Sequence, residues 1–215
     1  MVAPDGLTIV RAGGLAVLVL AVCAVRPAGA LEFTQRMVGA EQILSVTGPF
    51  LPGDEGRFVK AVEKAGRVDE VWLSSDGGSL FAGLAIGRAL RKAGLATRIP
   101  AGAECASACA YAFIGGVFRT VDPKGRVGVH MTSRYVDPEV LAAITGIIQR
   151  YGPGGAREVI PYVEQWAARS AAAQAKYLVE MSVSLELMTP IVETHKREIH
   201  WLSRSELQRY NVVNQ

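Results

Sequence analysis

Two residues in the middle of the chain have the chemistry of a nucleophile and its general base, and the first of them is Ser107. It stands where a small-residue segment, 101–106, meets an apolar stretch with helical periodicity, 108–114. A helix start offers unpaired backbone N–H groups, which can hold an oxyanion once a base removes the serine proton. A serine at this position can also simply cap the helix. The local sequence therefore leaves both roles open.

The candidate base is His130, which ends the segment Arg-Val-Gly-Val-His at 126–130. This segment predicts a strand, and strand ends are where open α/β sheets place functional side chains. Imidazole titrates near neutral pH and can serve as a general base. A hydrogen-bonded histidine at a sheet edge is the alternative. The remaining histidines, His195 and His200, lie near a charged helix end, and we expect both to face solvent.

A glycine pair, Gly77-Gly78, follows an apolar segment at 70–73. It lacks the Lys-Ser/Thr of a phosphate-binding loop and the full G-x-G-x-x-G pattern of a dinucleotide site, so nucleotide binding is disfavoured. Glycine does let a ligand carbonyl approach backbone N–H groups closely. The turn is therefore a candidate source of hydrogen-bond donors.

The elements that must position these residues alternate between strand and helix. We expect strands near 42–46, 70–73, 97–100, 118–121 and 126–129, and helices near 54–65, 80–93 and 108–114. This alternation predicts an α/β layered domain with mostly parallel short strands. After His130 the pattern changes, with helices expected at 138–151 and 161–193, separated by a glycine-rich loop at 152–155. A helical arm at about 136–198 is therefore expected after the sheet.

The first thirty residues have the pattern of a signal peptide. Arg11 precedes an apolar run at 15–25, and Ala28-Gly29-Ala30 has the small-x-small form that signal peptidase accepts. The run is shorter than the roughly 20 residues of a membrane-spanning helix. We expect cleavage after Ala30, export to the periplasm, and one mature domain at 31–215. An uncleaved segment would instead anchor the chain in a membrane.

The charge of the chain gives little support to a nucleic-acid partner. The formal net charge is only +3 and no block of Lys and Arg occurs. We also find no set of residues with the spacing of metal ligands, and no cofactor motif. The sequence thus predicts a protein that uses neither nucleic acid, metal nor cofactor.

Three segments together carry more information than any one motif. VWLSSDGGSLFAGLAIGRALRKAG, IPAGAECASACAYAFIGG and RVGVHM resemble the ClpP/crotonase superfamily, and most of all its exported ClpP-like members. In that family a strand ends in a Ser-Pro-Gly-Gly-like turn, the nucleophile opens a later helix, and the histidine closes a later strand. The resemblance implies a ClpP/crotonase-like fold with Ser107 as nucleophile, His130 as general base, and the N–H groups of Gly78 and Ala108 as the oxyanion hole.

Two positions depart from the family pattern. Asp76 replaces the proline usual before the glycine pair, which changes the stiffness of the turn and puts a carboxylate close to the cleft. The acid expected two positions before the Trp201-Leu202 pair falls on Ile199. Glu198 is adjacent and is kept as a candidate third member of the triad, although a shift of one place changes the direction of a side chain.

Cys105 and Cys109 lie two positions before and two after Ser107. Residues four apart in a helix are about 6 Å from each other at Cα, which a disulfide accepts. An exported protein would meet conditions that permit such a bridge. The alternative is that both cysteines are small buried hydrophobic residues.

The leading hypothesis is an exported serine peptidase or related acyl hydrolase that acts on a peptide or protein substrate. A non-catalytic ClpP-like binding or scaffold protein is the alternative, since Ile199 leaves the triad incomplete. An acyl-CoA enzyme of the crotonase type ranks last, because export removes the supply of thioester. The Ala-rich stretch at 167–178 could pack against a second copy of the chain, as in a homo-oligomer, or against its own core.

Overall fold

The structure is a computed structural model that describes residues 29–133 and 138–215. The expected signal peptide at 1–30 lies almost entirely outside the described residues. Among the described helices, none combines the length and the apolar character needed to cross a membrane.

The strands form two sheets. The larger has the order β1-β2-β3-β4-β6, and the smaller has the order β5-β7-β8. Strands β2, β3, β4 and β6 run parallel, as do β5 and β7, whereas β1 and β8 are antiparallel to their neighbours. The strand bounds are β1 (Glu32–Val38), β2 (Glu41–Thr47), β3 (Glu70–Ser74), β4 (Ala96–Ile99), β5 (Glu104–Ala106), β6 (Arg119–Val121), β7 (Arg126–Val129) and β8 (His200–Trp201).

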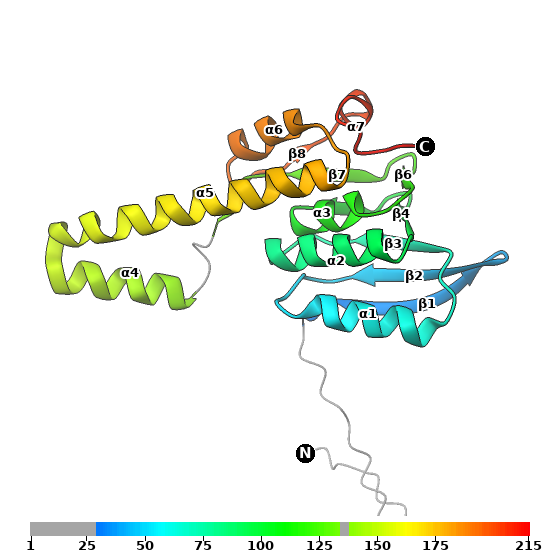
Figure 1. The fold of residues 1–215 in the computed structure, drawn as a ribbon, viewed down its shortest axis with the longest axis horizontal. Helices are drawn as coiled ribbons and strands as arrows, with labels where there is room; N and C mark the ends of the chain where they lie inside the picture. The colour runs from blue at the N-terminus through cyan, green and yellow to red at the C-terminus, as the bar shows by residue number, and fades with distance from the viewer. Residues whose placement is uncertain (1–28, 134–137) are drawn as a thin grey trace, which may run out of the picture.

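Helices cover these sheets and extend beyond them. In Figure 1, α1, α2 and α3 lie one above another along the strands, and a long C-terminal helix, α5, follows. The helices are α1 (Asp54–Ala65), α2 (Leu80–Lys92), α3 (Ala108–Ile114), α4 (Pro138–Tyr151), α5 (Ala156–Glu180), α6 (Met188–Glu193) and α7 (Arg204–Arg209), with short 3₁₀ turns η1 (Gly152–Gly155) and η2 (Leu185–Leu187). The expected α/β layered fold with mostly parallel strands is therefore confirmed.

Close packing of α2 against α3 fixes the start of α3 in the core. A Cβ added to Gly83 would lie 2.3 Å from the carbonyl oxygen of Ala108, so only glycine fits between the two helices at this point. All seven residues of α3 are buried, which explains its uninterrupted run of small and apolar residues. The helix that begins after Ser107 is thus held on several sides.

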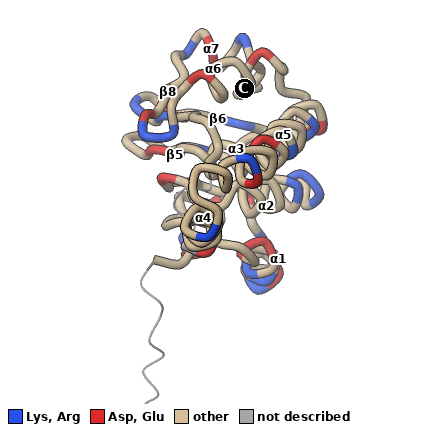
Figure 2. The backbone as a smooth tube through the Cα atoms, turned by 90° about the vertical axis from the view of Figure 1, so that its left-hand side faces the viewer, with Lys and Arg blue, Asp and Glu red and all other residues tan. Residues whose placement is uncertain are grey.

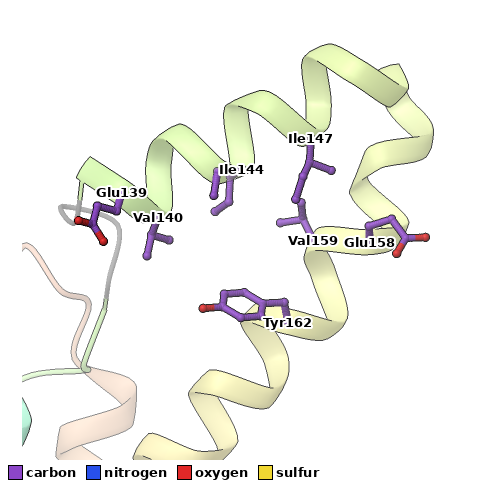
Figure 3. A pocket seen from close by; sticks show the side chains of 8 residues that line it. Glu139, Val140, Ile144, Ile147, Glu158, Val159 and Tyr162 are labelled. Carbon is purple, nitrogen blue, oxygen red and sulfur yellow. The ribbon is translucent and has the colours of Figure 1, made fainter.

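The helices α4 and α5 form an arm that projects away from the sheets (Figure 1). The second half of α5 is anchored on the core: the Tyr177 hydroxyl donates to the Tyr111 carbonyl at 2.6 Å, and the Tyr111 hydroxyl bonds to the Gln174 side chain. Between the two arm helices, Ile144, Val159 and their neighbours line a cavity of about 560 Å³ (Figure 3). The expected arm is therefore present.

Few charges occur on the outer arm helix. Glu139 and Arg150 are its only charged residues, and Figure 2 shows α4 as mostly uncharged. Several large apolar side chains of the arm are exposed, namely Leu141, Ile148, Tyr151, Ile160, Tyr162 and Val163. Most of the arm's apolar surface is therefore left in contact with solvent.

The structure corrects several element boundaries. Helix α5 begins at Ala156 and includes Pro161 in its interior, whereas we expected a helix to start at 161. It ends at Glu180 and not at 193, because Ser182 adopts a positive φ of 57° and turns the chain. The expected glycine-rich loop at 152–155 is a 3₁₀ turn.

Three strands were not expected from the sequence. Strand β1 has almost no buried side chain and so lacks the apolar alternation that marks a half-buried strand. Strands β5 and β8 have three and two residues, too few for any periodicity. Strands β5 and β8 depend on pairing with β7, which is distant in sequence, and these two build the candidate site.

Candidate active site

The smaller sheet carries Ser107 and His130 on neighbouring strand ends. Ser107 follows β5 directly and His130 follows β7 directly, and these strands run parallel with Ala106 paired to Gly128. The Ser107 N–H donates to the Gly128 carbonyl at 3.0 Å, which continues this pairing by one residue. The carboxyl ends of adjacent parallel strands meet at the same edge of a sheet. The topology therefore places the expected nucleophile and base at one edge.

The backbone of Ser107 is strained. Its φ of 56° and ψ of −121° lie outside the regions that residues with a Cβ ordinarily adopt. Such strain costs of the order of 1–3 kcal/mol and is concentrated at functional sites. Ser107 occupies the N-cap position of α3, yet its side chain makes no capping hydrogen bond. The capping role, left open by the sequence, is thus not the one this hydroxyl performs.

Gly77 packs directly against Ser107. A Cβ added to Gly77 would lie 2.6 Å from the Ser107 Cβ and 2.7 Å from the Ala106 carbonyl oxygen. Its φ of 103° also favours glycine. Sequence reasoning singled out Gly78 as the functional member of the pair and assigned no separate role to Gly77. The glycine pair was the only signal for this contact, because only the fold reveals which glycine faces the serine.

Ser75 positions the glycine turn. Its backbone bridges to β5, where its N–H donates to the Glu104 carbonyl at 2.8 Å and its carbonyl accepts from Ala106 at 2.9 Å. Its hydroxyl donates to the Gly48 carbonyl at 2.6 Å and accepts the Gly77 N–H at 3.0 Å. Strand β3 is thereby joined to the strand that carries Ser107, a role the sequence did not reveal.

The two expected oxyanion donors are Gly78 and Ala108. Gly78 forms a bridge with Phe50, but the hydrogen bonds of this bridge use the carbonyl of Gly77 and the N–H of Ser79. Ala108 is the first residue of α3, where an N–H has no acceptor within the helix. Across the described ranges, neither N–H donates to a protein acceptor. Both donors are therefore free of a backbone partner, as the sequence led us to expect.

A disulfide joins Cys105 to Cys109, with the Cα atoms 5.1 Å apart. Both cysteines are fully buried. The bridge connects the end of β5 to the first turn of α3 and so spans Ser107 on either side. The expected bridge is present in the structure.

The environment of His130 favours its neutral form. The imidazole is half-buried, and its Nδ1 is buried with no hydrogen-bond partner in the part of the chain that the structure describes. Burial lowers the pKa of His130 below its ordinary value, and a backbone hydrogen bond at Met131 offsets this only partly. A neutral imidazole is the form that accepts a proton.

No hydrogen bond joins the Ser107 hydroxyl to the His130 ring in the structure. Catalytic hydrogen bonds are often long before a substrate binds. Shared placement at the sheet edge is compatible with the expected contact between Ser107 and His130, which stays a prediction.

The position expected for the acid that orients His130 is occupied by an apolar residue, Ile199. The pairing of β8 with β7 ends with Val129 opposite His200, so Ile199 and His130 are the next residues along the two strands. The Ile199 side chain packs on Gly128, where an added Cβ would lie 2.4 Å from Ile199 Cγ2. No carboxylate stands at this position.

Glu198 is exposed, and its N–H donates to the His195 carbonyl at 2.8 Å. Glu198 therefore lies in a turn that precedes Ile199 and β8, and not in the extended strand. The structure shows no contact between Glu198 and His130. Its role as a third triad member therefore remains a prediction.

The other two histidines differ in their surroundings. His195 is exposed, as expected. His200 lies in β8 and not at a helix end; its side chain is partly exposed, and its Nε2 is 2.8 Å from Glu206 Oε1. Hydrogen bonds from Ser203, together with the contact to His200, lower the pKa of Glu206 to about 2. Glu206 belongs to the capping box of α7, while His200 pairs with Val129, the residue before His130.

A cavity of about 470 Å³ lies beside the glycine turn. It is lined by residues of three chain segments, Gly48, Pro49, Ser74, Ser75, Asp76, Gly77, Gly102 and Glu104. Within residues 29–133 and 138–215, no three His, Cys, Asp or Glu side chains are grouped closely enough to hold a metal ion. The polar groups of this cavity are backbone amides, two serines and two carboxylates.

Comparison with known proteins defines the fold. No family model matches the sequence, and no curated protein matches it either. Among solved structures, a ClpP1 mutant from Listeria monocytogenes matches with a TM-score of 0.54 at 17% identity, over 80% of this chain and 88% of that one. A mutant of a membrane-bound stomatin-specific protease matches with a TM-score of 0.48 at 14% identity, over 79% and 75%. The first similarity shows that the chain has a ClpP-like fold.

Proposed function

We propose that this protein is a serine peptidase in which Ser107 attacks the scissile carbonyl and His130 accepts its proton. The observation that carries the proposal is the backbone of Ser107. It is strained, it is clamped by a disulfide and a glycine contact, and its hydroxyl makes no cap. Strain of this kind persists only where surrounding structure enforces it. Ser107 therefore has the features of a nucleophile held ready on a turn.

The free backbone donors support the electrostatic half of this mechanism. The N–H groups of Gly78 and Ala108 flank the Gly77–Ser107 contact and have no acceptor among the described residues. In the proposed reaction they stabilise the negative oxygen of the tetrahedral intermediate. Loss of one such donor typically costs about a hundredfold to a thousandfold in rate.

The neutral imidazole of His130 supports the proton-transfer half. As Ser107 Oγ bonds to the substrate carbonyl carbon, its proton passes to His130. The imidazolium then protonates the leaving amine, which departs and leaves an acyl ester on Ser107. Water then attacks the ester carbon and gives a proton to His130; the C–Oγ bond breaks, the acid product departs, and the imidazolium returns the proton to Ser107 Oγ. Ile199, and not a carboxylate, lies directly before β8, next to His130 in the strand register. Because no carboxylate there can stabilise the imidazolium, we expect slow turnover.

The test is covalent labelling of the purified protein with a fluorophosphonate, followed by mass-spectrometric identification of the modified residue. We expect one label, on Ser107, and none in Ser107→Ala. Ser79→Ala is a suitable control, because Ser79 lies on the neighbouring turn but caps α2 with its hydroxyl. Absence of label from Ser107 in the folded wild-type protein would leave the non-catalytic binding or scaffold role as the better account.

We also propose that the protein is exported, on the strength of the apolar run and the Ala28-Gly29-Ala30 site. The presence of a disulfide agrees with an oxidising compartment. N-terminal sequencing of the protein produced in a Gram-negative host checks this proposal. A mature chain that begins at Leu31 supports cleavage, and an intact N-terminus in the membrane fraction supports an anchor.

A further inference from the structure

The cavity of about 470 Å³ beside the glycine turn adjoins the candidate nucleophile. Gly77 lines this cavity and also contacts Ser107, and Glu104 lines it from the strand that leads to Ser107. A group bound in the cavity would therefore lie near a bond held at Ser107. The cavity can select the part of a substrate that flanks the reacting carbonyl.

The free charge of the cavity is negative. Of its two carboxylates, Glu104 is paired with Arg126 at 2.7 Å, and the Arg126 guanidinium also lies 3.9 Å from the centre of the Trp201 ring. Asp76 is exposed and forms no ion pair or hydrogen bond with any described residue. The rest of the lining is uncharged. An incoming cation would thus meet one carboxylate with no competing basic partner.

The Asp76 carboxylate is also unusual for its position in the sequence. Asp76 occupies the position where the resembled family usually has proline, directly before the glycine pair. No hydrogen bond of the Asp76 side chain helps to build the turn, which is instead held by the hydroxyl of Ser75. Asp76 therefore has no visible structural task, and its charge is available to a ligand.

We propose that this cavity binds the cationic side chain of a lysine or arginine next to the scissile bond of a peptide substrate, with Asp76 as its charge partner. The inference rests on the proposed function of Ser107, because it places the cavity at the reacting bond. An exposed ion pair is screened by water, so the preference for a cation over a neutral side chain is modest, about fivefold. It decreases as ionic strength rises.

The experiment measures binding without turnover. The Ser107→Ala protein is titrated, by NMR at low salt, with three blocked alanine pentapeptides whose central residue is lysine, glutamine or glutamate. We expect the lysine peptide to bind about fivefold tighter than the glutamine peptide, and the glutamate peptide to bind most weakly. Adding Asp76→Asn should make the lysine and glutamine peptides equal, whereas Asp76→Glu should keep the preference.

Glu55→Gln is the matched control, because it removes one exposed carboxylate on α1 that does not line the cavity, with the same change in net charge. It should leave the preference unchanged. Equal binding of all three peptides, no binding of the lysine peptide, or a preference that persists in Asp76→Asn would each overturn the inference. Fluorophosphonate labelling of Ser107 is measured separately. A preference for the lysine peptide without labelling of Ser107 would contradict the peptidase function but not the cation site.

Discussion

The two halves of the candidate site differ in how firmly the fold supports them. On the nucleophile side, Ser107 is held by a disulfide, a strand hydrogen bond and the close contact with Gly77. On the base side, His130 has a buried Nδ1 with no partner among the described residues. The neighbouring position, directly before β8, is occupied by Ile199, which is apolar. The fold therefore holds the proposed nucleophile and oxyanion donors firmly, whereas it supplies no group that would stabilise an imidazolium at His130.

This difference indicates where the reaction is limited. A strained serine beside free N–H donors contributes to attack and to oxyanion stabilisation whether or not the base is well supported. An unsupported imidazole must develop positive charge in a half-buried site, which burial disfavours. The predicted enzyme thus acylates slowly, and changes on the two sides should have effects of opposite sign.

The largest effect is expected from Gly77→Ala, which disrupts the well-built side. The added Cβ would meet Ser107 Cβ at 2.6 Å and two backbone atoms at 3.0 Å or less, at a φ of 103°. Strain and overpacking together should lower the free energy of unfolding by about 3 kcal/mol or more and abolish labelling of Ser107. Urea denaturation and labelling measure the two effects.

Gly66→Ala separates steric clash from backbone strain. Gly66 also has a positive φ, 69°, but an added Cβ would meet nothing within 4 Å. We expect this control to cost only about 1–2 kcal/mol, with normal labelling. If Gly77→Ala is no worse than Gly66→Ala, the contact between Gly77 and Ser107 does not position the nucleophile.

The next largest effect is a gain, from Ile199→Asp, which supplies a carboxylate on the poorly supported side. A carboxylate opposite His130 would stabilise the imidazolium and should raise the rate of Ser107 labelling about tenfold or more, since its loss from a complete triad costs about ten-thousandfold. Ile199→Asn has similar shape without charge and should give no gain. Equal rates for the two variants would show that charge at this position has no effect on His130.

The pH profile of labelling gives a smaller but sign-specific effect. Burial lowers the pKa of His130 below its ordinary 6.5, and only the neutral ring accepts a proton. The rate should therefore rise with pH through a midpoint below 6.5 and stay level above it. In Ile199→Asp the midpoint should move upward, because an opposite charge favours the imidazolium. A wild-type midpoint above 6.5 would contradict the burial of a neutral His130.

The same pKa shift affects stability. The folded protein holds a proton on His130 less tightly than the unfolded chain does. The contribution of His130 to stability is therefore constant above 6.5 and falls as the pH drops from 6.5 through the lower folded pKa. His130→Ala removes this contribution.

The smallest effect is expected from Glu198→Gln. Glu198 is exposed, lies in the turn before β8, and forms no ion pair or hydrogen bond with His130. Labelling of Ser107 should change less than about twofold, the range of an exposed charge. A loss of tens-fold would mean that Glu198 swings toward His130 and completes the triad, and the contrast drawn between the two sides would then be wrong.

The fold could largely be predicted from the sequence, because its core strands and helices carry their own patterns. The segments at 70–73, 80–93 and 108–114 each showed apolar runs or periodicity with turn residues at their ends. The short strands β5 and β8 could not, because pairing with β7 alone defines them. Strand β5 brings Ser107 to the edge of the smaller sheet, and β8 brings Ile199 to the same sheet.

The candidate site was predictable in its residue types and not in its contacts. The sequence indicated Ser107, Cys105 and Cys109 around one helix start, and His130 at the end of a predicted strand. It could not show that Gly77, and not Gly78, touches the serine, since both glycines satisfy the same turn. Nor could it show that the hydroxyl of Ser75 holds this turn, because that bond runs to a residue 27 positions earlier, Gly48.

The most direct test of the account is the rate at which a fluorophosphonate modifies Ser107, compared between the wild-type protein and His130→Ala at neutral pH. Removal of a general base should lower this rate about a hundredfold, with Ser107 still the modified residue and the thermal unfolding midpoint little changed. A slow, His130-dependent label on Ser107 is the predicted result. Labelling of Ser107 at the same rate in both proteins would contradict the pairing of this serine with this histidine.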